Sequence, residues 1–247
     1  MKSVDIIIPV YNEEEALPGS IATLDLFLRE NVRNTCTITI ADNGSTDKTA
    51  AIAGELAKKY PEVRLVHLDQ KGRGHALYKT LLESQADIVG YMDVDLSTDL
   101  KAFPLLIAAI EGDYDISIGS RLLPESRVVR SPKREFVSRV YNLMVRVMFF
   151  TGFHDAQCGF KAIKREVAQK LVPLVENKNW FFDTELLLLA QKGGYSIKEL
   201  PVEWAEDPGT TVHVGKTAWE DIKGLLRMRF HPSRGLGKLK KSHIKGG

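Results

Sequence analysis

The chain has 247 residues, of which 44% are hydrophobic, and a net charge of +2, which fits one α/β domain with a substantial core. No apolar run reaches the ~20 positions of a membrane span, and the first strand-like run is too early and too short for a secretory leader. Cys36 and Cys158 form no CxxC motif, so we expect neither a zinc site nor a disulfide framework, but buried thiols in a reducing cytosol.

The first 120 residues alternate between strand-like and helix-like patterns. Short, mostly apolar runs predict strands at residues 4–10, 36–41, 63–68, 88–92 and 116–119. Longer patterns with polar start signals predict helices at residues 13–30, 47–60, 74–84 and 99–111. This alternation is typical of a Rossmann-like α/β fold, with a mostly parallel central sheet and helices on both faces.

The second half is less regular. Residues 121–133 are charged, contain two prolines and predict a loop. Helices are expected at residues 134–150, 165–175, 184–192 and 218–230, with a short apolar stretch at 160–163 and strands at 195–200 and 202–204. We therefore expect one domain over residues 1–230, followed by a basic, flexible tail at 231–247.

Charge is divided unevenly between the two halves. Residues 1–120 carry 11 Lys and Arg against 19 Asp and Glu, a balance of −8, whereas residues 121–247 carry 23 against 13, a balance of +10. The second half is therefore expected to attract anions.

Two aspartates follow the fourth predicted strand. Asp93 and Asp95 are two residues apart, and in a strand residues i and i+2 face the same side, so both carboxylates point one way. Such a pair suits Mg²⁺ or Mn²⁺, which complete their shell with water and substrate phosphates. The alternative is a helix-capping role, which Ser97, Thr98 and Asp99 would also serve.

The fingerprints of other nucleotide-binding enzymes are absent. Residues 9–16 contain no glycine, and Leu77 takes the third glycine position after Gly72 and Gly74, so the dinucleotide-binding pattern is not met. A Walker A loop is missing, and acidic residues follow the first strand where a sugar nucleotidyltransferase needs a glycine-rich, basic loop.

An ordered set of motifs instead resembles the GT-A glycosyltransferases of family 2. The motifs are IPVYNE (8–13), ADNGSTD (41–47), KGRGHAL (71–77), DVD (93–95), GSR (119–121) and DAQCGFK (155–161). Within the family, the chain is similar to the branch that charges polyprenyl phosphates, the dolichyl-phosphate glucose and mannose synthases. DAQCGFK, with WFFDTELL (180–187) and LPVEW (200–204), favours the glucose type.

The resemblance implies that residues 1–120 bind a nucleotide sugar. The residues it assigns to this donor are Pro9, Tyr11, Glu13, Asp42, Lys71, Arg73, Gly74, Asp93 and Val94. Asp42 would accept a hydrogen bond from the uracil N3–H, and Lys71 and Arg73 would contact the diphosphate. Asp93 and Asp95 would hold the divalent cation. Taken without the resemblance, residues 42–46 are also good turn chemistry, and residues 71–74 also fit a solvated loop.

The resemblance also implies that residues 121–230 bind the acceptor. Arg121, Arg134 and Ser138 fall where the family holds the acceptor phosphate, which arginine forks suit. Arg139 is a less certain fourth member, because it also fits a surface charge at a helix start. Asp183 and Glu185 lie where other inverting relatives keep a carboxylate that acts as the base. A phosphate acceptor, whose second pKa is about 6, needs little help from a base, so we expect Asp183 to position the acceptor or its arginines.

Two features of the chain depart from the family pattern. Asn43 stands where the family usually has a second aspartate for the ribose, and Ser97 stands where mannose synthases have a glutamine that binds metal. His213, in a flexible-looking segment, is a candidate for closing over the nucleotide, with a solvated loop histidine as the alternative.

The resulting hypothesis is an inverting, Mg²⁺- or Mn²⁺-dependent enzyme that moves glucose from UDP-glucose to a polyprenyl or dolichyl phosphate. The alternatives are mannose transfer from GDP-mannose, transfer to a saccharide hydroxyl, and a nucleotide-sensing protein without turnover. The expected location is the cytoplasmic face of a membrane, through the Met- and Phe-rich residues 136–153 and the basic tail, with or without a separate anchoring subunit. Core packing is the other explanation of that apolar stretch, and no nucleic-acid partner is expected.

Overall fold

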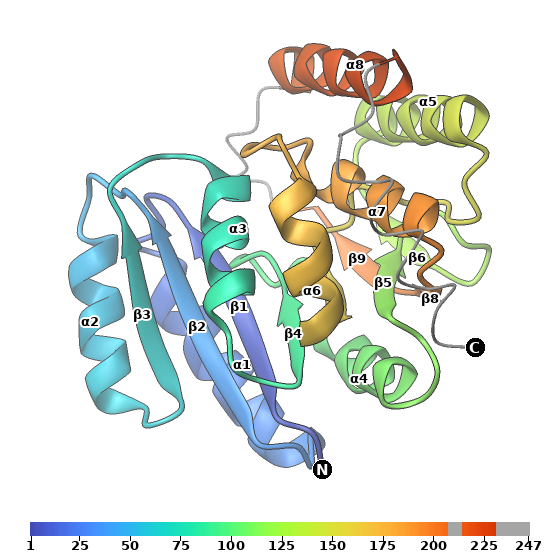
Figure 1. Ribbon diagram of the computed structural model, residues 1–247. Helices are drawn as coiled ribbons and strands as arrows, with labels where there is room; N and C mark the ends of the chain where they lie inside the picture. The colour runs from blue at the N-terminus through green and yellow to red at the C-terminus, as the bar shows by residue number, and fades with distance from the viewer. Residues whose placement is uncertain (207–213, 231–247) are drawn as a thin grey trace.

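The computed structural model describes residues 1–206 and 214–230, which are built around a seven-stranded sheet (Figure 1). The strand order is β3-β2-β1-β4-β7-β5-β8; β7 runs antiparallel to both neighbours, and the other pairs are parallel. The strands are β1 (Val4–Val10), β2 (Cys36–Asn43), β3 (Val63–Leu68), β4 (Ile88–Tyr91), β5 (Ile116–Ser120), β7 (Lys161–Lys164) and β8 (Ile197–Pro201). β6 (Arg127–Val129) and β9 (Glu203–Ala205) form a second, two-stranded parallel sheet.

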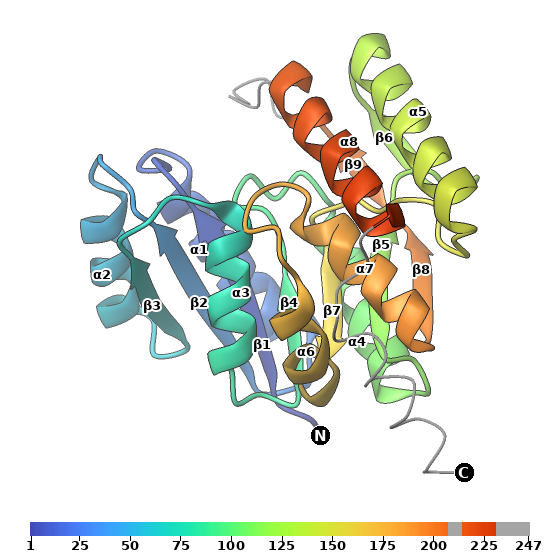
Figure 2. The same cartoon turned by 45° about the horizontal axis from the view of Figure 1, so that its top comes forward.

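Helices cover both faces of the main sheet (Figure 1). Those on one face are α1 (Leu17–Asn31), α2 (Thr49–Lys59), the 3₁₀ turn η1 (Leu100–Ala102) and α4 (Phe103–Glu111). Those on the other are α3 (Arg73–Glu83), α6 (Arg165–Leu171), the 3₁₀ turn η2 (Val172–Leu174) and α7 (Phe182–Gly193). Two more helices, α5 (Pro132–Phe149) and α8 (Val214–Phe230), lie side by side at the top of the molecule (Figures 1 and 2).

The central strands show why the sheet forms. In β1, Ile6, Ile7 and Ile8 are all fully buried, because this strand has neighbours on both edges and helices on both faces. A strand in that position is apolar throughout rather than alternating. The predicted mostly parallel α/β sheet with helices on both faces is therefore confirmed.

Local boundaries differ from the prediction in two places. Helix α1 begins at Leu17 rather than at residue 13, because Asn12 has a left-handed backbone (φ +56°) and its side chain accepts a hydrogen bond from the Thr46 amide at 2.8 Å. This bond ties the loop after β1 to the loop after β2. Strand β6 lies inside the stretch predicted as a loop, where three mostly exposed residues pair with β9 and no apolar run marks a strand.

The reversed strand β7 places a loop from the second half beside the end of β4. Because β7 is antiparallel, its first residue, Lys161, is in register with Tyr91, the last residue of β4. The DAQCGFK segment at residues 155–161 therefore enters the sheet at the edge where the parallel strands end. This pairing brings residues of the second half next to Asp93.

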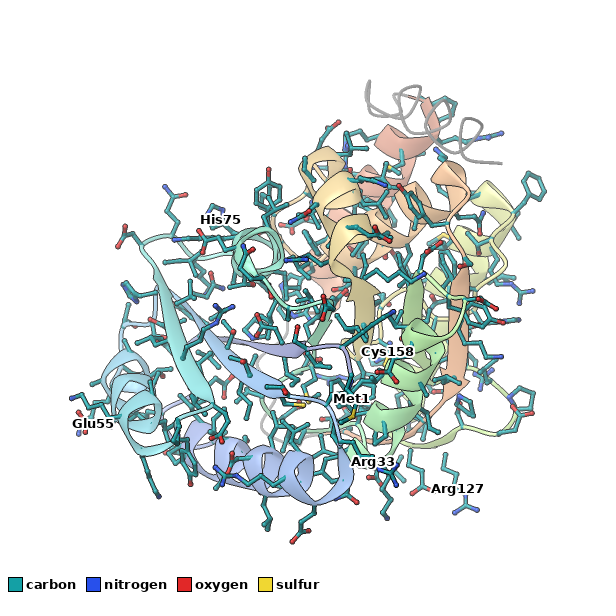
Figure 3. All side chains as sticks on the ribbon, turned by 60° about the horizontal axis from the view of Figure 1, so that its bottom comes forward. Met1, Arg33, Glu55, His75, Arg127 and Cys158 are labelled. Atoms are coloured by element: carbon teal, nitrogen blue, oxygen red, sulfur yellow. The ribbon has the colours of Figure 1, made fainter. Side chains whose placement is uncertain are left out.

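The cysteines and the helices agree with the expectations from composition. Cys158 is buried inside the molecule, whereas Glu55 and Arg127 lie at its surface (Figure 3). Cys36 is partly buried, and burial raises the pKa of both thiols to about 11, which favours the protonated thiol at neutral pH. Within the described residues, no helix combines the length and the apolar character needed to cross a bilayer.

Candidate active site

The ends of β1, β2 and β3 meet at one edge of the sheet, and the predicted donor residues of these strands lie there. Lys71 Nζ lies 3.6 Å from the centre of the Tyr11 ring, so the loop after β3 contacts the loop after β1. Asn43 Oδ1 accepts a hydrogen bond from the Gly72 amide at 2.7 Å, which joins the end of β2 to the same loop. Pro9 and Glu13 are partly buried nearby in sequence, and Val94 is buried.

Asp42 is held by two neighbours. Its side chain is fully buried, Oδ1 accepts from the Ser45 amide at 3.2 Å, and Oδ2 lies 2.6 Å from Nδ1 of His67 on β3. His67 is not among the residues predicted for the site. Its place opposite Asp42 in the β2–β3 register explains the contact, and register between strands cannot be read from a single strand.

Gly74 allows close packing at the start of α3. A Cβ at this position would lie 2.7 Å from backbone atoms of Lys178 and Asn179, so a larger residue would push this loop away. Gly74, which the resemblance assigns to the donor site, therefore packs closely against the chain itself in this structure.

A buried network of charges lies beneath Asp93. Arg73 donates to Asp93 Oδ1 at 2.8 Å and to Asp183 Oδ2 at 2.6 Å, and so joins two of the predicted site carboxylates. Asp183 Oδ1 accepts from Lys161 Nζ at 2.8 Å and from the Tyr91 hydroxyl at 2.7 Å. The two carboxylates joined by Arg73 are far apart in sequence. Lys161 and Tyr91, which also bind Asp183, are not among the predicted site residues.

This network decides the charge of Asp183. Burial acts to raise the pKa of this carboxyl, but the positive charges of Lys161 and Arg73 and the Tyr91 hydrogen bond lower it below its ordinary value. Asp183 is therefore an ionised, fully engaged carboxylate that neutralises two buried cations. Its arginine partner is Arg73 of the donor half, rather than Arg121 or Arg134 of the acceptor half.

Asp93 and Asp95 lie beyond the end of β4, which stops at Tyr91. The expected alternation still holds, since both aspartates are exposed and Val94 between them is buried. The helix cap that follows is made by Asp99, whose Oδ1 accepts from the Lys101 amide at 2.9 Å, so capping does not need the aspartate pair. Asp95 Oδ1 accepts from the Ser97 amide at 2.9 Å and shapes the turn.

The pocket at this turn fits a hard divalent cation. Asp93, Asp95 and Ser97 line one small pocket, and Ser97 Oγ is buried without a hydrogen-bond partner among the described residues. Two carboxylates and a hydroxyl are oxygen donors of the kind that Mg²⁺ and Mn²⁺ take, with substrate phosphates and water completing the shell. The described residues hold no cluster of three or more His, Cys, Asp or Glu suited to a metal.

Gly159 makes room for Asp93. A Cβ at residue 159 would lie 2.1 Å from Asp93 Oδ2, a distance that no pair of non-bonded atoms tolerates. The glycine of the DAQCGFK motif therefore sets where the Asp93 carboxylate lies. The motif was noted in the sequence, but this contact depends on the register of β7.

The predicted acceptor residues lie on the loop that follows β5 and on α5. Arg121 is held in a fork by Asp155, which accepts from the Arg121 backbone amide at 3.0 Å, from Nε at 2.8 Å and from Nη2 at 3.0 Å. Burial opposes the ionisation of Asp155, but the Arg121 charge lowers the pKa of this carboxyl to about 2. Arg121 also lies near Asp93, whose charge contributes to raising the arginine's pKa.

Arg134 and Ser138 follow at the start of α5. Arg134 Nη1 is 2.7 Å from Glu206 Oε1, so this arginine has a carboxylate partner. Ser138 lies on the buried face of α5, and its Oγ has no hydrogen-bond partner in the described part of the chain. Arg139 is exposed and paired with Glu135, which agrees with the surface-charge alternative. His213 and the basic tail lie outside the described residues.

Comparisons with known proteins identify the family. The family model described as "Glycosyl transferase family 2" matches residues 5–172. The chain is a family 2 glycosyltransferase. This glycosyltransferase is 31% identical, over 253 residues, to the dolichyl-phosphate beta-glucosyltransferase of Dictyostelium discoideum, covering 96% of the chain and 77% of the relative.

Two further proteins are similar to this glycosyltransferase over most of its length. The polyprenol monophosphomannose synthase of Mycolicibacterium smegmatis is 32% identical, covering 81% of this glycosyltransferase and 77% of the relative. Glycosyltransferase AglD of Haloferax volcanii is 36% identical over 90% of the chain, but the chain spans 35% of that relative's length.

Solved structures agree on the fold. Glucosyl-3-phosphoglycerate synthase from Mycobacterium tuberculosis, crystallised with Mn²⁺, UDP and glucosyl-3-phosphoglycerate, superimposes with a TM-score of 0.67. The match has 18% sequence identity and covers 92% of this glycosyltransferase and 80% of the other chain. The GT-A fold implied by the sequence resemblance is thereby confirmed.

Proposed function

We propose that this glycosyltransferase transfers glucose from UDP-glucose to the phosphate of a polyprenyl or dolichyl phosphate, with inversion at the sugar carbon. In the reaction, an acceptor phosphate oxygen forms a bond to C1 of the sugar. The bond from C1 to the UDP oxygen breaks, and its electron pair leaves with UDP. The relatives named as dolichyl-phosphate glucosyltransferases support this choice of donor and acceptor.

The observation that carries the proposal is the state of Asp183. A hydroxyl acceptor must lose a proton, so an enzyme that uses one needs a general base near the reacting atoms. In this chain the carboxylate at that position is ionised but bound to Arg73, Lys161 and Tyr91, and its lowered pKa makes it a weak base. A phosphate acceptor is already ionised at neutral pH and needs no base.

In this proposal, one half of the site binds the donor and the other half binds the acceptor. Lys71 and Arg73 bind the donor diphosphate, Asp42 contacts the base, and Arg121, Arg134 and Ser138 hold the acceptor phosphate. Asp93 and Asp95, with Ser97, would hold a Mg²⁺ or Mn²⁺ ion that offsets charge on the leaving diphosphate. Positioning of two anions against fixed cations supplies the rest of the rate enhancement.

Binding at a lipid surface fits the exposed faces of α5 and α8. The exposed apolar residues of α5 are Phe136, Val140, Leu143 and Val147, and those of α8 are Trp219, Leu226 and Phe230. Each set recurs at helical spacing and lies opposite the buried face of its helix. We propose that these stripes enter the interface of the cytoplasmic leaflet, where the acceptor's lipid tail resides.

The test is transfer of radiolabelled glucose from UDP-glucose to dolichyl phosphate, with and without EDTA. We expect lipid-linked glucose, its loss in chelator and its recovery with Mn²⁺ or Mg²⁺. Full activity in chelator would exclude the metal role. Transfer from GDP-mannose instead would change the donor, and transfer to a saccharide hydroxyl alone would overturn the acceptor. Binding of UDP without any product would favour a nucleotide-sensing protein.

A further inference from the structure

Arg130 is a buried arginine just before α5 that has no role in the site described so far. Its side chain is 5% exposed, and its Nε donates to Glu135. Its Nη2 is buried and has no hydrogen-bond partner among the residues that the structure describes. A buried guanidinium donor without an acceptor costs free energy, so the position points to a ligand that is bound during function.

Trp204 on β9 brings Arg130 and Arg121 together. The guanidinium carbons of Arg121 and Arg130 lie 5.5 Å and 5.9 Å, respectively, from the centre of the Trp204 ring. Both distances are in the range of cation–π contacts. Trp204 therefore contacts both positively charged side chains.

The electrostatics of this pair favour an anion. Burial, followed by the positive charge of Arg121, lowers the pKa of Arg130, while Glu135 acts in the opposite direction. Arg121 is already paired with Asp155, and Arg134 with Glu206. Of these three arginines, Arg130 is therefore the one whose buried Nη2 donor has no partner among the described residues. An anionic oxygen between Arg121 and Arg130 would relieve the repulsion between their charges.

Trp204 is also joined to the aspartate loop. It forms a bridge with Thr98, and the amide of Ala205 donates to the Ser97 carbonyl at 2.9 Å. The same strand pairs through its other edge with β6, which leads into Arg130. One strand therefore fixes the arginine pair relative to the loop that carries Asp93 and Asp95.

We propose that Arg130 is a further ligand of the acceptor phosphate, donating from Nη2, and that Trp204 is the positioning residue for the Arg121–Arg130 pair. The ligand class is a phosphate monoester. This inference rests on the proposed function for the identity of the acceptor. A purely structural role, in which Arg130 only anchors α5 through Glu135, predicts that any cation at this position would serve.

The experiment compares Arg130→Lys and Arg130→Ala with Arg127→Ala, a control because Arg127 is also an arginine paired with a glutamate but is exposed on β6. Initial rates are measured against a short-chain isoprenyl monophosphate and, separately, against UDP-glucose. Loss of a charge-assisted hydrogen bond should raise the acceptor KM by roughly tenfold to a hundredfold in both Arg130 variants. The donor KM and the binding of UDP should not change, and the control should match the wild type.

A second measurement does not require turnover. Trp204 lies against both guanidiniums, so tryptophan fluorescence is recorded during titration with the isoprenyl monophosphate and with inorganic phosphate. Wild-type protein should respond with saturation, and Arg130→Lys should require a higher concentration. If the wild type forms lipid-linked sugar and Arg130→Lys has an unchanged acceptor KM, the inference is wrong. If phosphate binds through Arg130 but no sugar is transferred to any polyprenyl phosphate, the proposed function fails and the anion site stands.

Discussion

At the scale of single residues, Asp93 and Asp95 are held in different ways. Asp93 is fixed by Arg73 and by the space at Gly159, whereas Asp95 is exposed and bonds the Ser97 amide through one oxygen. An asparagine at residue 95 would keep an oxygen for that amide and lose the charge. Its effect would therefore isolate the charge from the shape of the turn.

We expect Asp95→Asn to lower the transfer rate by roughly a hundredfold or more, because charge stabilisation at the leaving group is among the largest catalytic terms. Its thermal midpoint should match that of the wild type. Steady-state transfer and thermal unfolding check this prediction. The control is Asp113→Asn, because Asp113 is an exposed aspartate in the loop between α4 and β5. Retained activity in Asp95→Asn would remove Asp95 from the metal site.

Gly159 allows a test of where Asp93 lies. In Gly159→Ala the new methyl group would overlap the Asp93 carboxylate, which must move away from Arg73. We expect the Mn²⁺ concentration for half-maximal activity to rise and the rate to fall by about tenfold or more. Gly152→Ala, where a Cβ meets nothing within 4 Å, is the control and should behave as wild type. Equal behaviour of both variants would contradict the role of Gly159.

Residue types at the strand ends were predictable from sequence, but their partners were not. Asp93 and Asp95 were identified because they follow an apolar strand, whereas Arg73 was assigned through the family resemblance. The contact between Arg73 and Asp183 joins residues 110 positions apart, and Arg130 stands in a segment that reads as a charged loop. Such contacts depend on tertiary packing, which a single sequence does not encode in any local pattern.

At the scale of elements, hydrophobic periodicity identified the helices and the parallel strands. Periodicity did not identify the direction of β7. The four residues of this strand are apolar or basic and fit either orientation, and pairing with the neighbouring strands determines the direction. Periodicity also missed β6, whose side chains are mostly exposed. These two strands bring the second half to the catalytic edge, so the junction of the two halves was the least predictable part of the fold.

Helix α8 carries a buried carboxyl, Asp221, whose ionisation is expected to make the stability of the fold depend on pH. Asp221 is 2% exposed, its Oδ2 accepts from Gln157 at 2.9 Å, and its Oδ1 has no partner among the described residues. Burial, with the charges of Glu220 and Asp183, raises the pKa of Asp221 from 3.8 to about 7. The folded protein therefore keeps this carboxyl protonated over a range in which the unfolded chain ionises it.

The sign of the pH effect follows from that difference. The contribution of Asp221 to stability is fully present below its unfolded pKa and is lost as pH rises towards the folded value near 7. The loss is at most about 1.4 kcal/mol per pH unit. We expect Asp221→Asn to be more stable relative to wild type at about pH 8 than at about pH 5, as measured by urea unfolding. A constant difference across this range would show that the pKa of Asp221 is not raised in the folded protein.

At the scale of the whole molecule, charge and apolar surface are placed in the same half. Residues 121–247 carry the balance of +10, and the exposed stripes of α5 and α8 belong to this half. An apolar stripe flanked by basic residues such as Arg139 and Arg146 is suited to the surface of an anionic bilayer. The donor half, at −8, would be repelled from the same surface, which would orient the molecule with its acceptor side towards the lipid.

This orientation predicts how the protein binds vesicles. In flotation with anionic vesicles, we expect the wild type to be recovered with the lipid and the double variant Phe136→Ser, Leu143→Ser to remain unbound. The control is Leu26→Ser, which removes an equally exposed leucine from α1 in the donor half, and it should float as wild type does. Binding should weaken in high salt and on neutral vesicles, because the basic residues act within a Debye length of the lipid headgroups. If the double variant has an unchanged thermal midpoint and still floats, α5 is not the membrane contact.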